Sequence, residues 1–366
     1  MDSSQKIAAR VAAGRASAAD PAPSEYGTFG TYVWDRSGNL LMQAEFTGWQ
    51  GVYWVDASAD GTTVASCGWY NTTPSYAGFI AAYAVSTGDS LLFYPLQTRG
   101  NVVALDAYAR LLLAGADQGY LFSRIGDGNF NPTPAMISLT ASGDTVMVSA
   151  LDATGSVGLI ASYQGEVVVF PISDGVPGTP ARWQLPNSAY LHAAALSADG
   201  SHVYVGANSG IQYAISVARF MSDPAPMWSA ALPGGGKVIY GVACSSNGGV
   251  SAVAGNTSDG GVVAYYADKY NNGAMYWQAS TAHSPNSVSM DAGGSWVALA
   301  DGHPDNTPGS FYLWQAMTGA LLWSYPTSDM SWPIKLSADG SLVAAGSDNG
   351  TVYVFAGPAN GDRAAA

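Results

Sequence analysis

The stretch from Asp301 to Asp305 holds the residue types most able to do chemistry in this sequence. Asp301, His303 and Asp305 stand at every second position, and His283 lies a short distance upstream. Carboxylates and imidazoles bind divalent metal ions and can also form an acid–base pair. The alternative is that Asp301 is a turn residue and the other side chains are solvated. We therefore expect either a divalent metal site at these four residues or a purely structural loop with no cofactor.

A second candidate set is spread along the whole chain and is rich in aromatic and amide side chains. Such side chains suit stacking and hydrogen bonding to a neutral ligand, such as a sugar or a peptide side chain. The seven positions are Tyr53, Asn101, Met147, His192, Tyr240, Asn286 and Trp332. Trp49 and Tyr190 are expected on the same face. The alternative is that the aromatic side chains only plug a central channel.

Asp56 and Lys335 form a third candidate set. They occupy equivalent positions in the first and last copies of the repeat described below, where most other copies have a small residue. If the copies close into a ring, the first and the last become neighbours. We therefore predict an ion pair that lines the channel and is structural rather than catalytic. The sequence has neither the GxSxG nucleophile motif nor the phosphate-binding GxxxxGK[ST] motif, so these motifs name no reaction.

The elements that must position these side chains come from a repeat of about 46 residues. Its marker is a tight turn of the type Ser-Ala-Asp-Gly, in which Asp and Gly supply the turn conformation. The seven turns begin at Ser58, Asp106, Asp152, Ser197, Ser245, Asp291 and Ser337, with successive spacings of 48, 46, 45, 48, 46 and 46 residues. Each turn is flanked by short apolar runs that alternate with period two, as expected for β-strands.

Two further positions support the same alignment. The ninth residue after the start of each turn is small, which suits a crowded interior. These residues are Cys67, Gly115, Ala161, Gly206, Ala254, Ala300 and Gly346. Third strands are expected at residues 119–123, 166–170, 211–215, 262–266, 311–314 and 351–355, and fourth strands at Phe93, Trp183, Trp228, Trp277 and Trp323. The last copy lacks a fourth strand, and we expect residues 40–46 to supply it.

The third strands carry a resemblance to known families. The segments GTYVWD (30–35), GSFYLWQ (309–315) and the strand that ends at Phe355 resemble the WD-repeat and quinoprotein-like seven-bladed β-propellers. The resemblance implies an all-β, seven-bladed propeller of four-stranded antiparallel blades over residues 27–357. Only Trp34-Asp35 keeps the Trp-Asp ending of the WD repeat, and no Gly-His pair precedes a first strand. The adjacent cysteines of quinone-dependent dehydrogenases are also missing, because Cys67 and Cys244 are far apart.

Composition limits the partners and the cellular context. Basic residues number 13 and acidic residues 26, so the net charge of −13 disfavours nucleic acid as a partner. No apolar run approaches the roughly 20 residues of a membrane-spanning helix. We expect Cys67 and Cys244 to be buried, unpaired thiols. Residues 1–26 are expected to be a frayed or helical tail with a linker, and 358–366 a C-terminal tail. No signal peptide is readable, which favours the cytoplasm; Ala-Ser-Ala before Ala19 leaves an exported protein as the alternative.

Long loops on a rigid scaffold commonly carry function. Two such loops are expected, at residues 69–76 in the first copy and 301–308 in the sixth. The leading hypothesis is a non-catalytic propeller that binds a protein, peptide or glycan on its upper face. The alternative is an enzyme or small-ligand binder at the channel mouth and the blade-six loop, with or without a metal.

Overall fold

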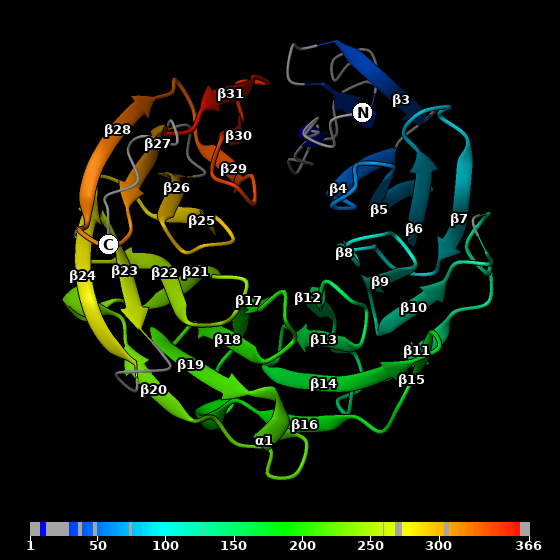
Figure 1. Ribbon diagram of the computed structural model, residues 1–366, viewed down its shortest axis with the longest axis horizontal. Helices are drawn as coiled ribbons and strands as arrows, with labels where there is room; N and C mark the ends of the chain where they lie inside the picture. Colours follow the sequence, from blue (N-terminus) through cyan, green and yellow to red (C-terminus); the bar gives the residue numbers. More distant parts are fainter. Residues whose placement is uncertain are drawn as a thin grey trace. The chain divides into compact units, whose positions relative to one another are not determined.

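The computed structural model describes residues 8–11, 29–35, 39–46, 50–72, 75–126, 128–258, 260–267, 273–303 and 307–358. The chain divides into two compact units, Met1–Pro180 and Ala181–Ala366, and each is described by itself. Both are built from antiparallel sheets joined in chain order (Figure 1). The all-β class expected from the repeat is therefore confirmed.

The first unit holds four sheets. An N-terminal sheet comprises β1 (Ala8–Val11), β2 (Phe29–Trp34) and β3 (Leu40–Phe46). The next comprises β4 (Gln50–Ala57), β5 (Thr63–Thr72), β6 (Ser75–Ala84) and β7 (Ser90–Leu96). The third comprises β8 (Val102–Leu105), β9 (Leu111–Gly115), β10 (Gly119–Ser123) and β11 (Ala135–Ile137). The fourth contains β12 (Val146–Leu151), β13 (Val157–Ser162), β14 (Glu166–Ser173) and β15 (Val176–Pro177).

The second unit starts at β16 (Ala181–Gln184) and holds four more sheets. The first comprises β17 (Leu191–Leu196), β18 (His202–Ala207), β19 (Ile211–Ser216) and β20 (Trp228–Ala231). The second comprises β21 (Val238–Cys244), β22 (Val250–Thr257), β23 (Gly260–Ala267) and β24 (Ala274–Thr281). The third comprises β25 (Pro285–Met290), β26 (Trp296–His303), β27 (Thr307–Gln315) and β28 (Ala320–Pro326). The last comprises β29 (Ser331–Leu336), β30 (Leu342–Ser347) and β31 (Val352–Ala356).

Helical structure is minor in the described part of the chain. It consists of α1 (Val217–Phe220) and two 3₁₀ turns, η2 (Pro186–Ser188) and η3 (Pro233–Gly235). No helix among the described residues is long and apolar enough to cross a membrane.

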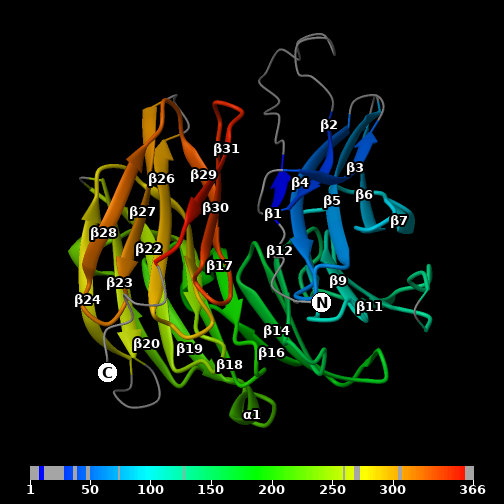
Figure 2. The same ribbon diagram turned by 45° about the horizontal axis from the view of Figure 1, so that its top comes forward.

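The N-terminal region differs from the expectation in two ways. Ala8–Val11 is a strand that pairs with β2, so the expected helix is wrong at these residues. Leu40–Phe46 is the expected strand, but its partner is β2 rather than the strand that ends at Phe355. Figure 2 shows β1, β2 and β3 beside β4 in the first unit. The duplicated third-strand pattern is thus accommodated by a separate three-stranded sheet.

The two long loops are also not loops in the structure. In the first copy β5 and β6 pair as far as Thr72 and Ser75, and in the sixth β26 and β27 pair as far as His303 and Thr307. The described residues of both segments therefore lengthen a hairpin.

The seven repeat turns have the conformation that their sequence predicts. The fourth residue of every turn has a positive φ, between 51° and 73°, which glycine adopts without steric cost. Ala109 is the single alanine in this position among the seven turns. Backbone hydrogen bonds also join consecutive turns, from Ala107 N–H to Ala153 O and from Ser246 N–H to Ala292 O. The turns therefore hold neighbouring sheets in register.

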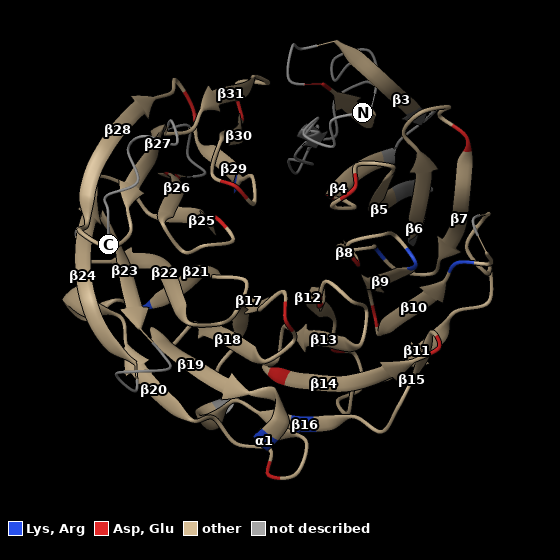
Figure 3. Ribbon diagram, in the orientation of Figure 1, with Lys and Arg blue, Asp and Glu red and all other residues tan. Residues whose placement is uncertain are grey.

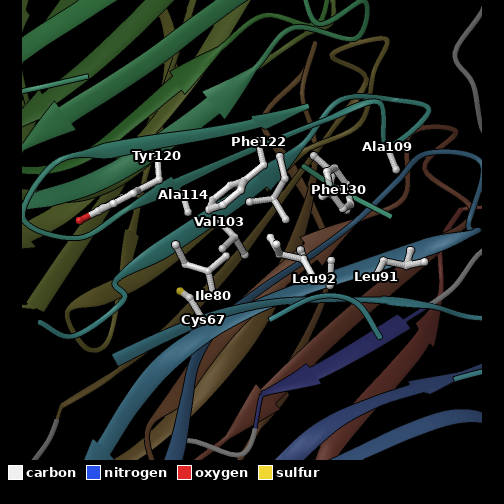
Figure 4. Close-up of a cluster of buried hydrophobic side chains, with 14 of the residues drawn as sticks. Cys67, Ile80, Leu91, Leu92, Val103, Ala109, Ala114, Tyr120, Phe122 and Phe130 are labelled. Atoms are coloured by element: carbon white, nitrogen blue, oxygen red, sulfur yellow. The ribbon is translucent and has the colours of Figure 1, made fainter. Parts of the chain in front are cut away.

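Buried apolar side chains lie between consecutive sheets. In the first unit one cluster fills the space between the β4–β7 and β8–β11 sheets (Figure 4). Ile80 and Leu92 approach it from one sheet, and Val103 and Phe122 from the other. Cys67 is fully buried in this cluster and is a free thiol, and burial raises its pKa well above the usual range. Cys244 is free as well, and burial raises its pKa to about 12.

The ring of small residues has a direct packing reason. A Cβ atom added to Gly206 would overlap Ile239 Cγ2, and one added to Gly115 would overlap Val146 Cγ1. Ile239 and Val146 belong to the first strand of the following sheet. Small residues are therefore needed where the next first strand approaches most closely.

Candidate functional site: the bulged ends of the first strands

The first strands share a local irregularity at one end. The pairing between first and second strands slips at one point in six of the described sheets, and the extra residue is a β-bulge. The residues at the slip are Tyr53, Met147, His192, Tyr240, Asn286, and Trp332 with Pro333. Asn101 directly precedes β8. With Asn101, these are the seven residues of the second candidate set, and we call them the rim residues. We call the end of each sheet at which its rim residue lies the upper end.

A bulge has a consequence for the side chain that it carries. The extra residue leaves the regular ladder, bends the strand and re-aims its side chain, and bulges are common beside functional sites. Because the bulge recurs at equivalent positions, the rim residues of consecutive sheets within a unit occupy equivalent places at the upper end.

In the second unit the bulges bring aromatic side chains together. The rings of His192 and Tyr240 lie 5.3 Å apart, although the residues come from different sheets. Burial lowers the pKa of His192, so its imidazole is kept neutral near pH 7. Tyr190 and Trp332 are 43% and 41% exposed and are therefore accessible to a partner. Two hydrogen bonds with Asn208 fix the backbone of Tyr190. The Asn208 N–H donates to Tyr190 O, and the Tyr190 N–H donates to Asn208 Oδ1.

The two rim asparagines have a structural role. Asn101 Nδ2 donates to Val146 O at 3.0 Å, and Asn286 Nδ2 donates to Ser331 O at 3.1 Å. In both cases the acceptor directly precedes the bulge of the next sheet. These amides join consecutive sheets. Each therefore spends on the next sheet part of the hydrogen-bonding capacity that we expected a ligand to use.

In the first unit the rim is polar and carries a cation. The guanidinium of Arg99 lies 4.6 Å from the ring centroid of Tyr53, and Arg99 Nε donates to Asn101 Oδ1 at 2.7 Å. Trp69 meets Tyr53 edge to face at 6.2 Å. Nothing in the sequence singles out Arg99, because it lies two residues before the rim residue Asn101. Its contacts with Tyr53 and Asn101 become visible only in the structure.

Asp56 has a partner inside its own unit. Asp56 Oδ2 accepts the Leu105 N–H at 2.8 Å, and Ser289, at the equivalent position, accepts the Leu336 N–H at 2.9 Å. A polar residue here therefore satisfies the first strand of the following sheet. Lys335 is exposed in β29. Its pairing with Asp56 would join the two units and stays a prediction.

Of the predicted metal set, Asp301 is the best described. It is fully buried in β26, and its carboxylate accepts hydrogen bonds from Ser310 N, Tyr312 Oη and His283 N at 2.7, 3.0 and 3.2 Å. Burial raises the pKa of Asp301, although these hydrogen bonds act in the opposite direction. Burial and the nearby Asp301 charge raise the pKa of Tyr312 to about 12. Asp301 thus joins β26 to β27 and to the β24–β25 connection, and it does so from within a strand rather than as the turn residue of the structural alternative.

The other predicted positions add little to a metal site. Asp305 and Trp49 lie outside the described residues, and only the backbone of His303 is described. Within the described part of the chain, no three His, Cys, Asp or Glu side chains lie close enough together to hold a metal ion. The metal set therefore stays a prediction.

Comparisons with known proteins agree on architecture. No family model matches the sequence, and no curated protein matches it. Among solved structures, the chain is similar to the β-propeller domain of Cps50 (Swd1) from Myceliophteria thermophila, with 15% identity and a TM-score of 0.61. That match covers 86% of this chain and 98% of the other.

A second solved structure is Sqt1 from Chaetomium thermophilum, bound to the N-terminus of ribosomal protein L10. The identity is 14% and the TM-score 0.69, and the match covers 85% of this chain and 86% of Sqt1. The level of identity supports the fold alone. Together with the repeated four-stranded antiparallel sheets, it establishes that the chain has a β-propeller fold.

Proposed function

We propose that this chain is a non-catalytic binding propeller that engages a protein segment or peptide through the rim residues at the upper ends of its sheets. The carrying observation is that, in six of the seven repeats, the bulge of the first strand coincides with a rim residue. A regular strand would hide half of its side chains between sheets, whereas a bulge re-aims one residue at a fixed place.

The composition of the rim fits a peptide partner. Tyr and Trp supply large contact areas at a low cost in side-chain entropy, and they are common energetic centres of interfaces. The exposed Tyr190 and Trp332 and the paired rings of His192 and Tyr240 provide such centres in one unit. Sqt1, which shares the fold, is seen with the N-terminus of a ribosomal protein. This supports peptide binding as a use of the scaffold but not the same partner.

We also propose that the chain has seven blades, each marked by one repeat turn. The β1–β3 sheet contains none of the seven aligned turns, and on this proposal it is an N-terminal addition and not an eighth repeat. An experimental structure in which the blades number other than seven would contradict this count.

Peptide binding can be tested with the full chain and a displayed library of random peptides. A selected peptide is then titrated against the wild type, Tyr240→Ala, Trp332→Ala and the control Tyr108→Ala. Tyr108 is 63% exposed in the repeat turn that follows β8, whereas the rim residue Asn101 precedes β8, so the two lie at opposite ends of that strand. We expect each rim substitution to weaken binding roughly 30-fold, as for an interface centre, and Tyr108→Ala to leave it unchanged.

Two results would contradict the proposal. One is a selected peptide that binds the rim variants as tightly as the wild type. The other is the absence of any selected peptide together with saturable binding on a glycan array, which would identify a glycan as the ligand. Unchanged thermal unfolding of each variant shows that a loss of binding is local.

A further inference from the structure

We propose that Arg99 is a recognition site for a carboxylate group of the bound peptide. This inference rests on the proposed function, because it names the chemistry of one contact at the same rim. It follows from the way in which the structure fixes the guanidinium and leaves part of it without a partner.

The backbone around Arg99 is held on its C-terminal side. The Gly100 N–H donates to Gly68 O at 2.9 Å, and the Asn101 N–H donates to Gly115 O at 2.8 Å. A side chain at position 100 would meet Cys67 Cβ at 2.9 Å, so the chain passes closely over β5. Arg99 therefore leaves the protein from a fixed point at the upper end of two neighbouring sheets.

The side chain of Arg99 is fixed as well. One face of the guanidinium lies over Tyr53, and Nε donates to Asn101 Oδ1. Asn101 is only 3% exposed, and its amide is held by Thr145 Oγ1 at 2.7 Å and by Val146 O. Because an arginine fixed in advance loses less side-chain entropy when it binds, a single contact there can be strong.

The remaining donors of Arg99 have no acceptor among the described residues. Arg99 donates a hydrogen bond from Nε and stacks the face of its guanidinium on Tyr53. Nη1 and Nη2 therefore remain as donors for a ligand. Since Nε is occupied, a carboxylate must bind end-on, with one oxygen on each Nη. A planar guanidinium recognises carboxylates through two such parallel bonds.

Other arginines of the described chain are used differently. Arg110 pairs with Asp106 at 3.1 Å, and Arg219 pairs with Asp223 at 3.1 Å. Arg124 donates to Gly128 O and to Thr63 Oγ1. Arg99 thus differs from Arg110 and Arg219 in having no ion pair with a described residue. It differs from Arg124 in being held at the rim.

One acidic side chain lies near this position. Asp117 Oδ1 accepts the Tyr120 hydroxyl at 2.8 Å and lies 3.5 Å from Thr98 Oγ1. Asp117 makes no ion pair with Arg99 in the structure, and its bond with Tyr120 holds it in place. It would disfavour a ligand with several negative charges, so we expect one carboxylate rather than an acidic run.

The site can be tested without knowledge of the natural partner. Chain labelled with ¹⁵N-arginine is titrated with N-acetyl-glutamate N-methylamide and, as the uncharged control, with the glutamine compound. We expect a saturable shift of the Arg99 Nε signal with the glutamate compound alone. The signal is assigned by its loss in Arg99→Lys, and Arg219, which is already paired, serves as the internal control. The absence of a saturable shift, or an equal shift with the glutamine compound, would overturn the proposal.

A peptide from the library then separates this inference from the proposed function. Replacing its Glu or Asp by the amide, or amidating its C-terminus, should weaken binding to the wild type at least about tenfold. The same change should have no effect on Arg99→Gln. A peptide that needs Tyr240 but shows no coupling to Arg99 would overturn the carboxylate site and leave the proposed function intact. A saturable glutamate shift without any peptide ligand would do the reverse.

Discussion

Asp301 illustrates how a residue with catalytic chemistry can be used for folding. Its carboxylate collects two backbone N–H groups and one tyrosine hydroxyl in a fully buried position. A buried charge is costly unless such donors compensate it. The donors come from two segments, the β24–β25 connection and β27, so the residue fixes how both segments meet β26. The same logic applies to Asn101 and Asn286, whose amides tie one sheet to the next.

The prediction at this scale concerns Asp301→Ala. The substitution leaves three buried donors without an acceptor, and we expect the free energy of unfolding to fall by about 2–5 kcal/mol. Urea-induced unfolding measures this loss. Ser289→Ala is a matched control, because it removes the acceptor of only one N–H group and should cost less. An Asp301→Ala protein as stable as the wild type would refute the structural role.

At the scale of the element, the first strand decides most of what the molecule presents. Its bulge aims a rim residue outward, and the residue before the bulge packs against a small residue of the previous sheet. Ile239 and Tyr240 show both functions side by side. A substitution at the small residue should therefore disturb packing and rim together.

Gly206 and Gly346 allow a matched test of that packing. A Cβ on Gly206 overlaps Ile239 Cγ2, whereas the nearest atom to a Cβ on Gly346 is Trp332 O at 3.3 Å. Neither residue has a positive φ, so packing alone separates them. We expect Gly206→Ala to cost about 1–3 kcal/mol of stability and Gly346→Ala less than about 1 kcal/mol. Chemical denaturation compares them, and equal losses would show that the close approach of Ile239 is not limiting.

The elements also show how far the sequence could lead. The turns were predictable because a fixed φ at the fourth position selects Gly, and even Ala109 follows the pattern. The strand at Leu40–Phe46 was predictable, but its partner was not, because period-two alternation gives a strand without naming its neighbour. The bulges were invisible, since no residue type marks them. Six of the seven rim positions fall at equivalent bulges, as the alignment of the repeats predicts. The structural role of Asn101 could not be predicted, because its hydrogen bonds depend on the neighbouring sheet.

At the scale of the whole molecule, charge is sparse and aromatic contact is abundant. Figure 3 shows few charged residues on most strands, in agreement with a charged share of 11%. The outer strands β24 and β28 contain no charged residue. On our proposal, recognition depends mainly on aromatic contact and on single, well-placed charges such as Arg99. Each unit carries its own rim residues.

The central claim is that the partner lies on the rim residues, and site-specific photocrosslinking tests it most directly. Benzoylphenylalanine is introduced in place of Tyr240 in one protein and in place of Tyr108 in another, and each is irradiated with the peptide selected from the library. We predict a crosslinked product from position 240 and none from position 108. Crosslinking from position 108 alone would place the partner at the turns and would contradict the account.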